Sequence, residues 1–418
     1  MKKLLIAVLC LMLTGCAAPA PSDGSGPDRS VSPDIPAPSP AASSAPNGES
    51  RTPQASPETD PETAENPSAS QEPSESSLGP QNQEQIIQEL LSAMTLEEKV
   101  GQMFFVRCPE TGGAELAAQY KVGGYLLFGR DFKDKTAQQV RDDIQSYQDA
   151  SGIPLLIGTD EEGGTVVRAS SNPDLFPQRE PAPQTLFAQG GMDLILQDAR
   201  QKSMTLLDLG VNVNFAPVAD VSTDPADFIY ARSFGQDAQA TANYVAQVVG
   251  VMGEEQIGSV LKHFPGYGNN VDTHTGIALD QRPYETFQTS DFLPFQAGIQ
   301  AGADAVLVSH NIAASMDESL PASLSPTVHK ILREELGFDG VVLTDDLAMD
   351  AVMEYAQNGS AAVLAIQAGN DMVVTTDFQT QIPQVIHAVQ SGVIAESQID
   401  QAVTRVLNWK YELGLLGN

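Results

Sequence analysis

Two of the five histidines in this 418-residue sequence lie close together in the stretch 262-KHFPGYGNNVDTHTG-276. Lys262 and His263 close an apolar run that is typical of a strand, whereas His274 follows in a glycine-rich loop. Asp272 precedes His274 by two residues, and side chains at i and i+2 of an extended segment project to the same side. A carboxylate placed there can select the imidazole tautomer and stabilise its charged form. The pair therefore predicts an acid–base site, although a loop histidine that only hydrogen-bonds its neighbour would show the same pattern.

Charged and polar side chains also stand where other apolar runs end. Each of them could merely cap the helix that follows. Several strand ends that carry aspartate, glutamate, lysine and histidine together favour a shared site instead, because the carboxyl ends of the strands of a parallel barrel meet at one mouth. These residues are Asp160, Glu161, Glu162, Lys262, His263, Ser309, His310, Asp345 and Asp346.

Asp345 directly follows the apolar run 341-VVLT-344. A carboxylate with little polarity behind it suits a nucleophile. It suits equally a structural ion pair with a nearby cation, for which Lys262 and Arg232 are the candidates. The residues alone leave both interpretations open.

Eight apolar runs rich in β-branched residues recur along the chain, and patterns of helical period separate most of them. Thr95 with Glu98 forms a capping box before the first run, and Ser325-Pro326 supplies a cap and a first-turn proline for a helix over 327–338. Strands and helices in alternation predict an α/β fold with a parallel sheet. The count favours a closed (β/α)₈ TIM-type barrel over a doubly wound open sheet. The runs are 100–106, 123–128, 154–160, 211–217, 258–264, 305–310, 340–346 and 371–376.

The N-terminus has the pattern of a lipoprotein leader. Two lysines precede an apolar run, and 13-LTGC-16 resembles a lipobox, so we expect residues 1–16 to be a signal peptide with Cys16 as the lipidated residue. An ordinary secretory signal is the alternative. Residues 17–83, rich in Pro, Ser and Glu, predict a disordered tether, and residues 84–418 predict the folded barrel. The protein should then be extracytoplasmic and held at the cell membrane through lipid only.

Composition excludes some partners. The formal charge of −32 argues against nucleic acid and against electrostatic docking on anionic lipid. Cys10 and Cys16 belong to the predicted leader, so Cys108 has no partner for an intrachain disulfide.

Six segments resemble, in the right order, the signature of glycoside hydrolase family 3, and most closely its bacterial β-N-acetylglucosaminidase branch. The likeness extends over residues 90–418. It implies a barrel enzyme that acts on carbohydrate and uses neither a metal ion nor a cofactor. The segments are 160-DEEGGTVVR-168, 214-NFAPVADV-221, 231-ARSFG-235, 262-KHFPGYGNNVDTH-274, 341-VVLTDDLAM-349 and 403-VTRVLNWKYELGL-415.

The resemblance also implies roles for single residues. Asp345 corresponds to the nucleophile, His274 to the general acid/base and Asp272 to its partner. In a retaining mechanism, Asp345 attacks the anomeric carbon while His274 protonates the leaving oxygen, and water then hydrolyses the covalent intermediate. The positions that match sugar-binding residues are Asp160, Arg168, Arg232, Lys262 and His263.

Three positions depart from the branch pattern. Tyr267 and Thr273 stand where histidine and serine are frequent, and Glu161 stands where glutamine is common. None of them is a proposed reacting group, but Tyr267 could alter loop packing and substrate preference. The single tryptophan, Trp409, is expected to pack a helix and not to stack on sugar.

The branch resemblance and the lipid anchor together predict release of terminal β-linked N-acetylglucosamine from peptidoglycan fragments. A β-glucosidase or β-xylosidase of the same family is the alternative. A metal-dependent barrel hydrolase, with Asp272, His274, His310 and Asp345 as ligands, is a rival of another class. A sugar-binding lipoprotein that has lost catalysis is the third possibility.

Overall fold

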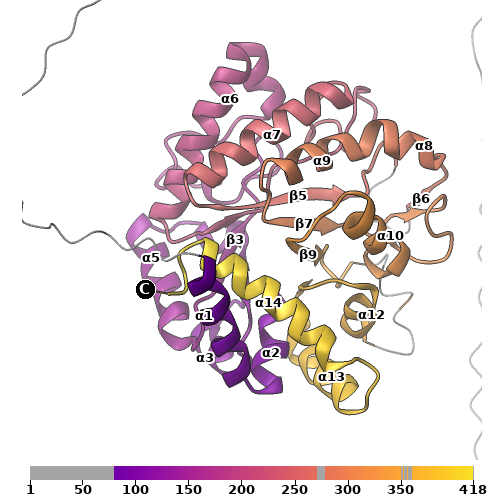
Figure 1. Cartoon of the computed structure of the whole chain (residues 1–418). Coiled ribbons are helices and arrows are strands. Elements are labelled where there is room, and N and C mark those ends of the chain that lie inside the picture. The colour runs from indigo at the N-terminus through magenta and orange to yellow at the C-terminus, as the bar shows by residue number, and fades with distance from the viewer. Residues whose placement is uncertain (1–79, 271–277, 350–351, 353–354, 356–359, 418) are drawn as a thin grey trace, which may run out of the picture. The chain divides into compact units, whose positions relative to one another are not determined.

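The computed structural model describes residues 80–270, 278–349, 352, 355 and 360–417 (Figure 1). Three of the residues singled out above, Cys16, Asp272 and His274, lie outside these ranges. The chain divides into two compact units between Pro73 and Ser74, and all the described residues belong to the second unit. No helix among these residues is long and apolar enough to cross a membrane.

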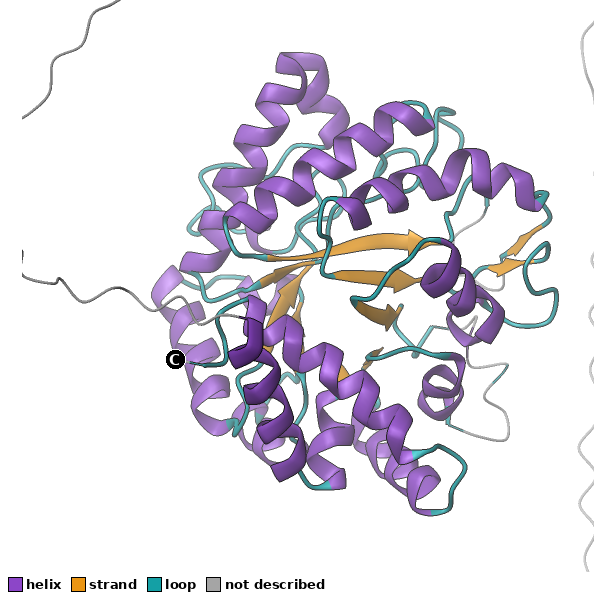
Figure 2. Cartoon of the chain, viewed as in Figure 1, coloured by secondary structure: helices purple, strands orange, loops and turns teal. Residues whose placement is uncertain are grey.

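An eight-stranded parallel sheet forms the centre of this unit, in the order β10-β1-β2-β3-β4-β5-β7-β9. The two outer strands meet through a parallel bridge between Leu343 and Met372, which joins the ends of the sheet into a barrel. Figure 2 shows the helices arranged around these strands. The predicted (β/α)₈ barrel is confirmed, and the open-sheet alternative is wrong. The strands are β1 (Phe104–Arg107), β2 (Gly124–Leu127), β3 (Leu156–Thr159), β4 (Val213–Asn214), β5 (Gly258–Phe264), β7 (Ala305–Val308), β9 (Val341–Thr344) and β10 (Val373–Thr375).

The helices cover the outside of the barrel and connect successive strands (Figure 1). They are α1 (Pro80–Ala93), α2 (Leu96–Gln102), α3 (Gly113–Tyr120), α4 (Gly129–Phe132), α5 (Ala137–Ala150), α6 (Pro183–Asp208), α7 (Ala238–Glu254), α8 (Tyr284–Thr286), α9 (Phe292–Gln300), α10 (Pro326–Lys330), α12 (Ala361–Ala368), α13 (Phe378–Gln390) and α14 (Glu396–Glu412). Shorter turns are the 3₁₀ helices η1 (Ala169–Ser171) and η4 (Ala322–Leu324) and the π-helices η3 (Phe287–Asp291) and η5 (Ile331–Glu335).

Each predicted apolar run contains one strand, but the boundaries differ. The Thr95–Glu98 capping box starts α2 as expected, and the helix continues to Gln102, so the residues 100–102 are helical and the strand begins at Phe104. The helix expected over 327–338 changes from α10 to the π-helix η5 after Lys330. A small additional sheet pairs β6 (Leu279–Asp280) with β8 (Ile312–Ala313), and strands of this length leave no periodic pattern in a sequence.

The interior of the barrel is packed with apolar side chains and is not a pore. Phe105 and Phe215 meet edge to face with ring centroids 5.2 Å apart. Trp409 of α14 belongs to the same cluster and is 2 % exposed. A Cβ atom on Gly258, the first residue of β5, would lie 3.0 Å from the Trp409 indole, so this ring closes the amino-terminal end of the barrel. The expected packing role of Trp409 is confirmed.

Candidate active site

The carboxyl ends of the strands surround a cavity of about 350 Å³. It is lined by Asp160, Arg168, Arg232, Lys262, His263 and Asp345, so the structure brings together all the predicted catalytic and sugar-binding residues that it describes. The proposed acid/base pair, Asp272 and His274, cannot be placed because it lies outside the described residues. The remaining lining residues are Arg107, Leu126, Phe128, Glu162, Val166, Phe215, Leu307, Asp346, Met349 and Val374.

A buried ion-pair network forms one wall of this cavity. Lys262 Nζ lies 2.8 Å from Asp160 Oδ1 and 2.6 Å from Glu162 Oε1. Arg232 binds Glu162 through two hydrogen bonds, of 3.0 Å from Nε and 2.8 Å from Nη2. The Lys262 and Glu162 side chains are only 3 % and 2 % exposed. Two cations thus balance two carboxylates away from solvent, which holds these donors and acceptors in fixed positions.

The charges of this network are mutually dependent. Burial by itself would raise the pKa of Glu162, but Arg232 and Lys262 outweigh burial and hold the pKa of the carboxyl well below its usual range. Burial likewise opposes the charge on Arg232, and Glu162 overcomes it and raises the pKa of the guanidinium. The lowered pKa favours an ionised Glu162 at neutral pH, which suits electrostatic support of the two cations and not proton transfer.

The His263 ring is held by hydrogen-bonding partners on both sides. Its Nε2 atom lies 2.9 Å from Arg232 Nη2, which can only donate, so Nε2 accepts and the ring proton resides on Nδ1. Nδ1 donates to Asp220 Oδ2 at 2.7 Å. The backbone N–H groups of His263 and Tyr267 also donate to the carboxylate of Asp220. Both ring nitrogens therefore have partners within the protein, which argues against a role of His263 in proton transfer. The Lys262–His263 peptide bond is cis, and both side chains line the cavity.

The base of the glycine-rich loop is tightly packed. The Tyr267 ring meets the His263 ring edge-on with centroids 5.2 Å apart and is 1 % exposed. Gly266 has φ 118°, and a Cβ atom there would lie 2.4 Å from Asp291 Oδ1. Only glycine tolerates this conformation and this contact, as expected from the sequence. Residues 271–277, which follow this base, lie outside the described residues.

Asp345 stands at the end of β9 and is half-buried at the cavity. Its Oδ1 atom accepts a hydrogen bond of 2.8 Å from the backbone N–H of Asp346. Its own backbone N–H donates to Val308 O at 3.0 Å, which ties it to the neighbouring strand β7. The candidate cations Lys262 and Arg232 bind Asp160 and Glu162 instead, so the arrangement favours a nucleophile over a structural ion pair with either of them.

Glu161 lies behind the cavity wall and supports the segment that carries Arg168. It is fully buried, and its Oε2 atom accepts from the backbone N–H groups of Arg168, Ala169 and Ser170 at 3.0, 2.7 and 3.3 Å. These bonds hold η1 and with it Arg168, whose Nη2 atom lies 3.2 Å from Asp160 Oδ2. Glu161 is therefore the residue that positions Arg168, a role that the sequence did not suggest.

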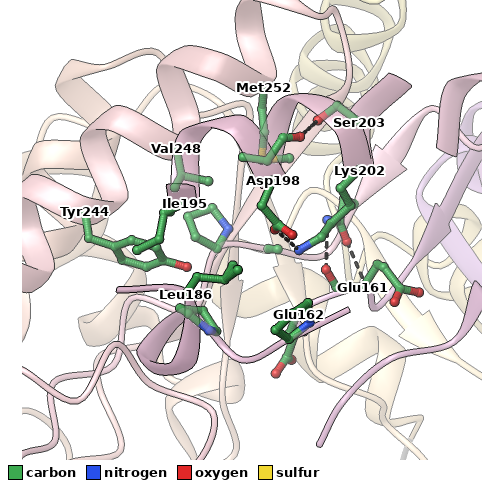
Figure 3. Close-up of a pocket in the computed structure, with 16 residues that line it drawn as sticks. Glu161, Glu162, Leu186, Ile195, Asp198, Lys202, Ser203, Tyr244, Val248 and Met252 are labelled. Atoms are coloured by element: carbon green, nitrogen blue, oxygen red, sulfur yellow. Dashed lines mark hydrogen bonds and ion pairs between the residues drawn. The ribbon is translucent and has the colours of Figure 1, made fainter. Parts of the chain in front are cut away.

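A second, smaller cavity of about 30 Å³ lies behind Glu161 and Glu162, between β4 and the helices α6 and α7 (Figure 3). This volume corresponds to about one water molecule. Lys202 approaches Asp198 at 3.1 Å and Glu180 at 3.4 Å, and these three side chains are largely buried. Burial raises the pKa of Glu180 to about 7, with Lys202 opposing and Asp198 adding to the shift. The cavity is too small for a sugar, so it belongs to the support of the site and not to substrate binding.

The sequence does not predict the roles of two further residues. It marks Glu162 only as one of several polar residues at strand ends, and Asp220 only as part of 214-NFAPVADV-221. Their positions after β3 and β4 were the available signal, but their partners depend on side-chain geometry. His310 does not reach the cavity: Nδ1 lies 2.7 Å from Ser323 Oγ and Nε2 lies 3.0 Å from Asp346 O. Among the described residues, no cluster of three or more His, Cys, Asp or Glu side chains is arranged to hold a metal ion.

Comparison with known proteins agrees with this geometry. The model of the glycosyl hydrolase family 3 N terminal domain matches residues 95–409. A beta-hexosaminidase of Stenotrophomonas maltophilia (strain R551-3) is 35 % identical over 318 residues, which cover 73 % of this chain and 89 % of that relative. A beta-hexosaminidase of Xanthomonas campestris pv. campestris (strain B100) is 32 % identical over 315 residues, which cover 73 % of this chain and 90 % of the relative.

Solved structures of similar proteins superpose on this chain. The structure of a glycoside hydrolase family 3 beta-N-acetylglucosaminidase from Paenibacillus sp. superposes with a TM-score of 0.71 at 31 % identity. The match covers 78 % of this chain, and this chain spans 64 % of that structure. A family 3 glycosyl hydrolase from Mycobacterium smegmatis superposes with a TM-score of 0.69 at 28 % identity, over 78 % of this chain and 99 % of that structure.

Proposed function

The chain belongs to glycosyl hydrolase family 3, and on this premise we propose that it removes terminal N-acetylglucosamine from peptidoglycan fragments with retention of configuration. It is a glycoside hydrolase that cleaves terminal β-linked N-acetylglucosamine. Curated relatives named beta-hexosaminidases are 32–35 % identical to it and are covered over 89–90 % of their length. The retaining chemistry, the peptidoglycan substrate and the roles of single residues are our proposal.

In the proposed reaction, the Asp345 carboxylate attacks the anomeric carbon from one side of the sugar. The bond from that carbon to the leaving oxygen breaks, and the leaving oxygen takes a proton from His274. His274, supported by Asp272, then removes a proton from water, which displaces Asp345 and releases the sugar. The half-buried position of Asp345 at the end of β9, with one oxygen hydrogen-bonded to the backbone, supports the nucleophile role.

The described residues would bind the terminal sugar while this chemistry occurs. The network of Asp160, Glu162, Lys262 and Arg232 offers ionised donors and acceptors at fixed distances, which suits sugar hydroxyl groups. The His263 ring lies beside this network and is held there by Arg232 and Asp220. Binding energy gained at these hydroxyls orients the anomeric carbon toward Asp345.

The observation that carries the proposal is the meeting of Asp345 with the Lys262 network in one cavity. We would test it by incubating the protein with an activated fluorinated N-acetylglucosaminide and locating the adduct by peptide mass spectrometry. The expected result is a glycosyl adduct on Asp345 and no adduct in the Asp345→Ala variant. An adduct on another side chain would refute the nucleophile assignment. Faster cleavage of aryl β-glucosides than of aryl β-N-acetylglucosaminides would overturn the activity.

The proposed location at the cell membrane rests on the sequence of the N-terminal residues. Cys16 after 13-LTG-15 supports lipidation, and a lipid anchor would place the enzyme on the outer side of the cell membrane, near the cell wall. Labelling with an alkyne-modified fatty acid should mark the wild type and not the Cys16→Ser variant. Loss of this label together with release of the variant into the medium is expected. Unchanged membrane retention of the variant would contradict the anchor.

A further inference from the structure

Arg107, the last residue of β1, lines the active-site cavity and differs from the other cations there. Arg168 binds Asp160, Arg232 binds Glu162, and Lys262 binds both of those carboxylates. The Arg107 side chain makes no hydrogen bond or ion pair with any described residue. Its Nε atom is buried without a partner, as is that of Arg168, but Arg168 has Asp160 as a partner for its Nη2 atom. Buried N–H groups are paired in nearly all folded proteins, so a partner for this guanidinium is to be expected from outside the chain.

The position of this guanidinium is set by an aromatic ring. The Arg107 Cζ atom lies 4.3 Å from the centroid of the Phe128 ring, and the Arg168 Cζ atom lies 5.1 Å from the same centroid. Stacking on the ring holds the planar group in place without using its N–H donors. Two guanidinium groups on one ring also make this corner of the cavity positive, and only one of them is paired with a carboxylate.

A stacked guanidinium with free donors is the group that proteins use to bind carboxylates in a bidentate manner. The terminal N-acetylglucosamine carries no charge, so an anionic partner must belong to the remainder of the substrate. We propose that Arg107 is a specificity residue that binds a carboxylate on the leaving-group side of the scissile bond. This inference rests on the proposed function, and it adds that acidic glycans are preferred over neutral ones. The sugar that follows N-acetylglucosamine in peptidoglycan has a lactyl ether, whose carboxylate is free where the stem peptide has been removed.

The experiment compares two disaccharides with the same linkage. One is N-acetylglucosaminyl-β-1,4-N-acetylmuramic acid, and the other is the methyl ester of its carboxylate, which keeps the shape and removes the charge. A neutral aryl β-N-acetylglucosaminide reports the activity itself. The variants are Arg107→Met, Arg107→Lys and, as a matched loss of one positive charge, Arg141→Met on the outer helix α5, where Arg141 pairs with Asp208.

We expect the wild type to cleave the acid with a higher kcat/KM than the ester. Arg107→Met should lower kcat/KM for the acid about 10- to 100-fold, the range set by a charge-assisted pair, and should lower kcat/KM for the ester and for the aryl substrate by a smaller factor. The kcat/KM of Arg107→Lys for the acid should lie between those of the wild type and Arg107→Met, because lysine keeps the charge and loses the bidentate geometry. Added salt should slow cleavage of the acid by the wild type more than by Arg107→Met. Arg141→Met should behave as the wild type.

Other outcomes would refute either the role of Arg107 or the proposed activity, and the experiment distinguishes the two. Equal losses on acid, ester and aryl substrate would show that Arg107 binds the neutral sugar, which refutes carboxylate recognition. No loss on any substrate refutes it as well. A wild type that cleaves the aryl substrate but does not distinguish acid from ester refutes the role of Arg107 and leaves the activity intact. A wild type that cleaves none of the three refutes the activity itself.

Discussion

The buried carboxylate of Glu161 allows a direct test of how the site is held together. Replacing Glu161 with alanine removes the acceptor of three backbone N–H groups, those of Arg168, Ala169 and Ser170. A buried N–H group left without an acceptor costs about 1–3 kcal/mol. The segments at Ala169 and Ser170 are buried, so these two groups alone predict a loss of about 2–6 kcal/mol in the free energy of unfolding.

The same change should impair binding of the sugar. Without Glu161 the 169–171 turn is no longer tied to the end of β3, and Arg168 loses its fixed place beside Asp160. We expect KM to rise and kcat/KM to fall on the order of 10- to 100-fold, as for other misplaced binding groups. Glu161→Gln keeps one acceptor oxygen and should fall between alanine and the wild type. The assays are urea unfolding and steady-state kinetics on an aryl β-N-acetylglucosaminide, below the unfolding midpoint of each variant.

A second buried carboxylate provides the control. Asp304 accepts hydrogen bonds from Ser259 N at 2.8 Å and Ser259 Oγ at 2.7 Å, next to the amino-terminal end of the barrel. Asp304→Asn should therefore lower stability and leave KM unchanged. The reasoning is refuted if Glu161→Ala is destabilised but binds and cleaves substrate as the wild type does, because Glu161 would then serve the fold alone.

Three further predictions concern other buried charges. Replacing Lys262 with methionine leaves two buried carboxylates short of positive charge, so urea unfolding should show a loss of about 3–5 kcal/mol. A loss under about 1 kcal/mol would contradict the network. Asp220→Asn should raise KM, because the amide no longer favours one tautomer of His263; an unchanged KM would rule this out. Lys410 is fully buried against Gln102 Oε1 (2.6 Å), and burial lowers its pKa to about 7 from 10.5. Between pH 7 and pH 10.5 the unfolded chain binds more protons than the folded protein, so the destabilising effect of this lysine decreases as the pH rises. Below pH 7, the free energy of unfolding of Lys410→Met should exceed that of the wild type by up to about 5 kcal/mol. Parallel pH–stability curves for variant and wild type would refute the shift.

The arrangement of the strands could be predicted from the sequence because burial restricts the residue types that a strand can contain. Strands covered on both faces are continuous apolar runs, and all eight predicted runs contain a strand of the barrel. The carboxyl ends of such strands meet at one mouth of a barrel, so the sequence predicts that Asp160, Lys262 and Asp345 share one site, and all three line the same cavity.

The partners of these residues could not be predicted in the same way. Glu161 differs from its neighbours only by burial and by the direction of its side chain, and neither is visible in the acidic triplet. Asp220 acts on His263 from another strand end, across 43 residues of sequence. The importance of Arg107 rests on the absence of a carboxylate within reach among the described residues, and no sequence pattern reports such an absence.

The packed barrel interior and the Trp409 ring at its base leave no passage along the barrel axis. A sugar that occupies the cavity must leave by the side from which it arrived. We therefore expect free N-acetylglucosamine to compete with the next substrate molecule for the cavity, so that the reaction slows as product accumulates.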